Sequence, residues 1–136
     1  MMAEMEIRPY EGFGPVDFGM TPTEVEDVIG PPESRFQRFP PLEEWLYQDS
    51  SLRIMFDSES QFEFVEFYEP TIAVVQEIRL TGSYAGLLQA LDGRGYAVTQ
   101  RGAVTICEAL GVVVGRERPD RDDIYTAGAF RRGYWE

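Results

Sequence analysis

The chain has 136 residues, of which 43% are hydrophobic, and both values are typical of a single globular domain. It carries 24 acidic residues against 12 basic ones, which gives a net charge of −12. This balance argues against binding to nucleic acids or to anionic membranes, which both need a basic surface. It is compatible with a basic protein partner, or with a charge that serves only solubility.

The first predicted element is a short helix that begins after Thr21. Thr21 is a suitable N-cap, Pro22 fits the first helical position, and Glu24 completes a capping box. Apolar residues then recur at helical spacing, namely Val25, Val28 and Ile29. Gly30, followed by two prolines, ends the helix after about two turns.

Four strands are expected next, at residues 44–47, 52–57, 62–68 and 73–80. The third is apolar on both faces, because alternation places Phe62 and Phe64 on one side and Val65 and Phe67 on the other. This pattern indicates a central strand that is covered on both sides, or one whose second face is left for a partner.

A second helix is predicted from residue 83 or 84 to residue 92. Its apolar stripe comprises Tyr84, Leu87, Leu88 and Leu91, and Gly93 can end it. Short strands are expected at residues 96–99, 103–107, 110–115 and 124–131, with a charged loop at 116–123 between the last two.

The order of these elements predicts an α+β fold in which two short helices cover one face of an antiparallel sheet. A helix followed by strands occurs twice, so residues 12–80 and 81–136 are interpreted as two repeated units within one domain. The two units have the same order of elements but share few identical residues.

Residues 19–25, Gly-Met-Thr-Pro-Thr-Glu-Val, and the Gly-Pro-Pro at 30–32 resemble the signature of the β-lactamase-inhibitor-like superfamily. That group includes small outer-membrane assembly lipoproteins and secreted β-lactamase inhibitors. The resemblance implies helix-plus-sheet units and a function in binding proteins. Residues 12–21 and 130–136 also resemble motifs of small uncharacterised bacterial cytoplasmic proteins. The chain departs from the named groups, since it has neither an N-terminal lipoprotein cysteine nor a cysteine pair.

The amino-acid composition restricts which metal sites and catalytic groups the chain can form. The chain has no His and no Lys, and Cys107 is its single cysteine, so no His or Cys metal cluster and no His-activated nucleophile can form. Cys107 lies in an apolar run and is expected to be buried and unreactive. Asp120, Asp122 and Asp123 alternate with arginines and are expected in a solvated loop. No catalytic residue, metal or cofactor is predicted.

Carboxylates and aromatic residues remain as candidate binding groups. They are concentrated on the predicted strands, and the candidates are Glu43, Glu44, Trp45, Tyr47, Glu63, Glu66, Tyr68 and Glu69. One hypothesis is an immunity-type or inhibitor protein whose acidic face binds a basic partner. The alternative is a small-molecule-binding protein or carboxylate-dependent enzyme with an aromatic pocket. No targeting or membrane-spanning segment is apparent, so the expected location is the cytoplasm.

Overall fold

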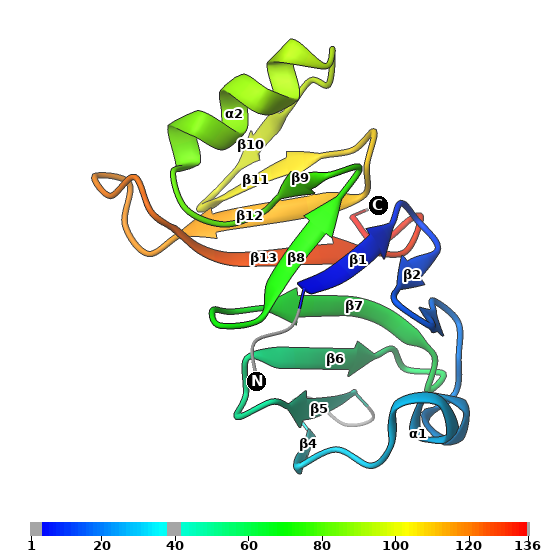
Figure 1. Cartoon of the computed structure of the whole chain (residues 1–136). Coiled ribbons are helices and arrows are strands. Elements are labelled where there is room, and N and C mark those ends of the chain that lie inside the picture. Colours follow the sequence, from blue (N-terminus) through cyan, green and yellow to red (C-terminus); the bar gives the residue numbers. More distant parts are fainter. Residues whose placement is uncertain (1–3, 38–41, 136) are drawn as a thin grey trace.

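The computed structural model describes residues 4–37 and 42–135. These residues form two short helices and mostly antiparallel strands, which confirms the α+β class (Figure 1). The helices are α1 (Pro22–Ile29) and α2 (Tyr84–Gly93). The strands are β1 (Glu4–Arg8), β2 (Gly12–Phe13), β3 (Val16–Asp17), β4 (Ser34–Gln37), β5 (Glu43–Tyr47), β6 (Leu52–Phe56), β7 (Phe62–Phe67), β8 (Ile72–Val75), β9 (Ile78–Arg79), β10 (Thr99–Arg101), β11 (Val104–Cys107), β12 (Val112–Arg116) and β13 (Ile124–Phe130).

Within the described residues the strands form two sheets. The large sheet has the order β10-β11-β12-β13-β7-β6-β5-β4 and is antiparallel throughout. The small sheet has the order β3-β2-β1-β8-β9, and its β1 and β8 are parallel. Figure 1 shows the small sheet lying across one face of the large sheet.

The main core lies between the two sheets. Ile7 and Val75 from the small sheet belong to the same buried cluster as Ile54 of the large sheet. Both helices add side chains to this cluster, Val25 from α1 and Leu87 and Leu91 from α2. The two helices therefore cover the same face of the large sheet as the small sheet does, as the sequence predicts.

Each helix precedes a series of antiparallel strands. Helix α1 is followed by β4, β5, β6 and β7, and α2 by β10, β11, β12 and β13. The two series occupy opposite halves of the large sheet and meet where β7 pairs with β13. Two copies of one unit would produce this order, but the interpretation as a sequence repeat stays a prediction.

The N-terminus of α1 has the predicted cap. The backbone N–H of Glu24 donates to Thr21 Oγ1 at 3.3 Å, and the backbone N–H of Thr21 donates to Glu24 Oε1 at 2.9 Å. Pro22 occupies the first helical position. Val25 is buried as expected, but Val28 is 42% exposed, so the predicted apolar stripe is only partly covered.

Some predicted strands differ in the structure. Residues 73–80 do not form one strand, because the chain turns at Gln76 and Glu77, where φ is 50° and 68°, and returns as β9. The strand expected at 96–99 is absent, and β10 begins at Thr99 instead. The strands β1, β2, β3 and β4 were not predicted, since they are short or strongly polar.

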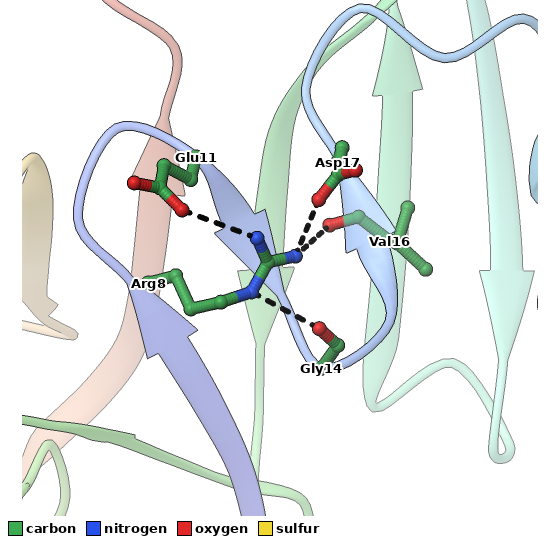
Figure 2. Close-up of polar contacts among 5 residues, drawn as sticks. All are labelled: Arg8, Glu11, Gly14, Val16 and Asp17. Atoms are coloured by element: carbon green, nitrogen blue, oxygen red, sulfur yellow. Dashed lines mark hydrogen bonds and ion pairs between the residues drawn. The ribbon is translucent and has the colours of Figure 1, made fainter.

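Arg8 holds the three N-terminal strands together (Figure 2). Its Nε donates to the carbonyl of Gly14 at 3.1 Å, and its Nη2 donates to the carbonyl of Val16 at 3.0 Å. The same guanidinium forms ion pairs with Asp17 at 2.7 Å and with Glu11 at 3.5 Å. Through these contacts, the Arg8 side chain crosslinks β1 to the β2–β3 hairpin.

Candidate functional site

The second face of the large sheet, called the outer face here, points away from the small sheet and the helices. Strand β12 illustrates the division, because Val112 and Val114 belong to the main core while Val113 belongs to a separate cluster on the outer face. This second cluster also contains Phe64 and Phe130. The outer face is therefore partly apolar. Tyr10, from the turn between β1 and β2, packs against this second cluster, as do Tyr134 and Trp135.

Strand register determines which outer-face residues are neighbours. Phe64 on β7 lies between Met55 on β6 and Phe130 on β13. In the adjacent row, Glu66 lies between Arg53 and Gly128. The apolar row and the polar row thus run side by side across the middle of the sheet.

A β-bulge places Phe64 on the outer face. Met55 pairs with Phe64 and Phe56 pairs with Phe62, so Glu63 is left as an extra residue on β7. The bulge shifts the alternation by one residue, and Phe62 joins the main core with Val65. The expectation that Phe62 and Phe64 share a face is therefore wrong.

A groove of about 230 Å³ opens on the outer face. Side chains that line it include Met55, Phe64, Glu66, Val104, Tyr134 and Trp135. Gly115 and Gly128 also line it, and their lack of a side chain leaves space in the centre of the sheet. A Cβ on Gly128 would lie 2.9 Å from Phe64 Cζ, so glycine is required for the Phe64 ring to lie where it does.

Residues after β13 form one wall of this groove. The ring of Tyr134 is stacked on Phe64 with centroids 5.0 Å apart, and the ring of Trp135 is at 87° to that of Tyr134. Arg101 donates to the carbonyl of Trp135 at 3.2 Å and lies 5.6 Å from the centroid of its ring. Trp135 Nε1 is buried and has no hydrogen-bond partner among the described residues.

Polar and aromatic side chains continue the outer face beside the groove. Arg53 lies 3.6 Å from the Glu44 carboxylate and 4.9 Å from the centroid of the Tyr68 ring. The Tyr68 hydroxyl donates to Glu66 Oε1 at 3.3 Å, and burial, followed by the nearby Glu66 charge, raises the pKa of Tyr68. The ring of Tyr125, which is 55% exposed, meets Tyr68 edge-on at 5.6 Å.

Three of the predicted binding residues therefore come together on this face: Glu44, Glu66 and Tyr68. Trp45 and Tyr47 are instead 2% and 8% exposed in the main core, so their expected role at a binding surface is wrong. Strand alternation is the reason, because Trp45 follows Glu44 directly and points to the opposite face. Burial raises the pKa of Tyr47 to about 12, and its hydroxyl donates to the Gly30 carbonyl at 2.9 Å.

The remaining candidates lie apart from one another. Glu63 is near Asp57 and Arg131 at the far end of β7, and burial is the main cause of its raised pKa. Glu69 follows β7 and accepts a hydrogen bond from the hydroxyl of Thr81. Glu43 is half-buried at the start of β5. These carboxylates are not part of the groove.

Asp122 has a structural role that the sequence did not reveal. Its Oδ2 accepts from Ser83 Oγ at 2.6 Å, and its Oδ1 accepts from the Ala85 backbone N–H at 3.0 Å. These two bonds lower the pKa of Asp122 and connect the charged loop to the N-terminus of α2. A sequence signal was absent because the loop and the helix are far apart along the chain.

Comparison with protein-family models, with curated proteins and with solved structures gave no match to this chain. Neither helix in residues 4–37 and 42–135 is long and apolar enough to cross a membrane. Within that same part of the chain, no group of three or more Asp, Glu or Cys side chains is arranged to hold a metal ion. The groove and its polar border are thus the basis for a functional assignment.

Proposed function

We propose that this chain is a non-catalytic protein-binding module that uses the outer face of the large sheet. The observation that carries the proposal is the groove, in which apolar and aromatic walls adjoin the Glu66 carboxylate. Protein interfaces commonly combine aromatic anchors with a polar rim. Exposed aromatic surface on this face comes from Phe36, which pairs with Glu44, and from Tyr125, which contacts Tyr68.

The charge of the chain supports a basic partner. Its net charge is −12, and two of the predicted acidic residues, Glu44 and Glu66, lie on the outer face. Long-range attraction between opposite charges accelerates association and selects among partners. An immunity-type or inhibitor role in the cytoplasm, in which the acidic chain neutralises a basic enzyme or toxin, fits this chemistry. The resemblance of residues 19–25 to the β-lactamase-inhibitor-like signature supports the same class.

Small-molecule binding is the second candidate, because the same groove would also bind a small molecule that packs against its aromatic side chains. The two candidates differ in what they retain from a host lysate. A protein-binding module captures a specific protein, whereas a small-molecule receptor or a carboxylate-dependent enzyme captures none through this face.

Affinity capture followed by titration with the purified partner tests the proposal. Phe36→Ser and Tyr125→Ser remove apolar contacts from the outer face, and we expect each to weaken binding by roughly tenfold. The matched control is Val28→Ser, since Val28 is 42% exposed but belongs to α1, on the other side of the large sheet. We expect this control to bind like the original chain.

Salt provides a second measurement on the same complex. The association rate should fall steeply as the ionic strength rises, because salt screens the electrostatic attraction between the acidic surface and a basic partner. The proposal is wrong if no partner is retained at any ionic strength. It is also wrong if Val28→Ser disrupts binding and the two outer-face variants do not.

A further inference from the structure

We infer that a second, polar pocket beside the N-terminus of α2 binds a small zwitterion of the class of free α-amino acids. This inference goes beyond the proposed function, because the pocket is separate from the groove on the outer face. The pocket has a volume of about 130 Å³. The polar side chains that line it belong to Tyr84, Gln100, Thr105, Arg116 and Glu117.

The pocket lies on the face of the large sheet that is opposite to the groove. Thr105 on β11 pairs with Val114, which belongs to the main core, and Gln100 on β10 pairs with Thr105. The Arg116 guanidinium lies over the ring of Tyr84, another residue of the main core. Figure 1 shows the start of α2, the β10–β11 turn and the loop after β12 at the same end of the large sheet. A ligand bound here does not occupy the outer face.

The charged loop after β12 leaves one cation and one anion for the pocket. Its other charged residues have partners within the loop or on α2, in the ion pairs Arg118–Asp120 and Arg121–Asp123 and in the hydrogen bonds from Ser83 and Ala85 to Asp122. Arg116 and Glu117 form no ion pair within residues 4–37 and 42–135. Both of them line the pocket, so a charged group of either sign finds a partner there.

Arg116 is fixed in position while part of its guanidinium stays available. Its Nη1 donates to the carbonyls of Pro119 at 2.9 Å and of Arg121 at 3.3 Å, and the guanidinium lies 4.1 Å from the centroid of the Tyr84 ring. Nε and Nη2 carry further N–H groups, and none of the described residues accepts from them. A ligand carboxylate can therefore accept two parallel hydrogen bonds from this edge of the guanidinium.

The buried hydroxyl groups also lack a partner for one hydrogen. Tyr84 and Thr105 are 6% and 5% exposed, and their hydroxyl oxygens are 2.5 Å apart. One hydroxyl donates in this bond, and Gln100 Nε2 donates to both oxygens at 2.8 Å and 3.3 Å. The other hydroxyl hydrogen has no acceptor among the described residues, and Gln100 Oε1 has no donor there. Buried polar groups are normally paired, so a ligand with both an acceptor and a donor suits this part of the pocket.

A small α-amino acid supplies both kinds of group. Its carboxylate accepts from Arg116 and from the remaining hydroxyl, while its ammonium group donates to Glu117 and to Gln100 Oε1. A simple anion would leave the Glu117 carboxylate with a like charge beside it, and a simple cation would do the same to Arg116. The volume has space for several non-hydrogen atoms, so the ligand carries a small side chain.

The probes are L-alanine and two relatives that each lack one of its charges. Propionate has no ammonium group, and L-alaninamide has a neutral amide in place of the carboxylate. In an assigned ¹H–¹⁵N spectrum, we expect L-alanine to shift the signals of Gly102 and Ala103 in the pocket and to leave the signal of Val28 on α1 in place. Propionate and L-alaninamide should each bind about tenfold more weakly, because each loses a set of charge-assisted hydrogen bonds.

Glu117→Gln keeps the shape of the side chain and removes the charge that faces the ammonium group. We expect this variant to lose the preference for L-alanine over propionate. Asp120→Asn is the matched control, because it removes a carboxylate charge from the same loop at an exposed residue outside the pocket. It should retain the preference. Both positions are exposed, so neither change should affect the fold.

The comparison of probes on the original chain decides the inference without any variant. Equal binding of L-alanine and propionate would overturn it, since the ammonium group would then be irrelevant. Equal binding of L-alaninamide would overturn it as well, because the carboxylate would not be recognised. An absence of L-alanine shifts at millimolar concentration, or shifts confined to the outer face, would exclude the pocket as the site. None of these results would affect the proposed function, which depends on the opposite face of the sheet.

Discussion

The rings of Tyr134 and Phe64 lie nearly parallel, with centroids 5.0 Å apart and planes 9° from each other. This contact joins the segment after β13 to the centre of the large sheet. The two rings also line the groove together. This aromatic pair therefore contributes both to the attachment of the C-terminal segment and to the shape of the candidate site.

Replacing Tyr134 with alanine should reduce the free energy of unfolding by about 1–3 kcal/mol, because the change removes the stack on Phe64 and buried apolar area. Tyr125→Ala is the comparison, since Tyr125 is 55% exposed and makes an edge contact with Tyr68. Its expected cost is at most about 0.5 kcal/mol. Urea unfolding of both variants measures the difference, and equal losses would contradict the structural role of Tyr134.

The cap of α1 can be tested by Thr21→Ala, which should lower the free energy of unfolding by about 1 kcal/mol. The variant removes the oxygen that accepts from the Glu24 N–H. Thr23→Ala is a matched control, because Thr23 is exposed within the same helix and alanine has the higher helix propensity. Chemical denaturation should separate the two variants, and a Thr21→Ala protein as stable as the Thr23→Ala protein would argue against the cap.

Asp122 should contribute to stability in a pH-dependent way. Its hydrogen bonds to Ser83 and to the Ala85 N–H hold its pKa below the ordinary value of 3.8. The charged form therefore stabilises the folded chain above pH 3.8, and this contribution is lost as the pH falls through the lower folded-state pKa.

Unfolding measurements on Asp122→Ala test this pH dependence. The variant's free energy of unfolding should fall furthest below that of the original chain near neutral pH. This difference should shrink as the solution is acidified below pH 3.8. Asp120→Ala is the control, because Asp120 is exposed and pairs only with Arg118 among its described neighbours. A deficit for Asp122→Ala that is independent of pH would show that its charge is not involved.

Cys107 is buried in the main core, as its apolar run predicts, and burial raises the pKa of its thiol. Both properties reduce the amount of accessible thiolate. We expect a thiol reagent to modify the folded chain slowly and the urea-unfolded chain rapidly, as followed by mass spectrometry. Complete native modification at the unfolded rate would mean that the thiol is accessible.

Elements with local signals are correctly predicted from the amino-acid sequence. The cap of α1 involves residues within one helical turn, so Thr21, Pro22 and Glu24 were sufficient to place it. The spacing of Leu87 and Leu91 likewise indicated the buried side of α2. The antiparallel arrangement of the larger sheet also followed from short strands that succeed one another along the chain.

The strand faces that form the candidate site depend on contacts between distant segments, which local sequence patterns do not predict. The bulge at Glu63 depends on how β7 pairs with β6, and this pairing reversed the expected direction of Phe62. The groove also requires Gly128 to lie beside Phe64, and Tyr134 to fold back onto the same ring. These contacts join residues that are distant in sequence. The alternation of side chains within one strand carries no information about the register between strands, or about a bulge that shifts that register.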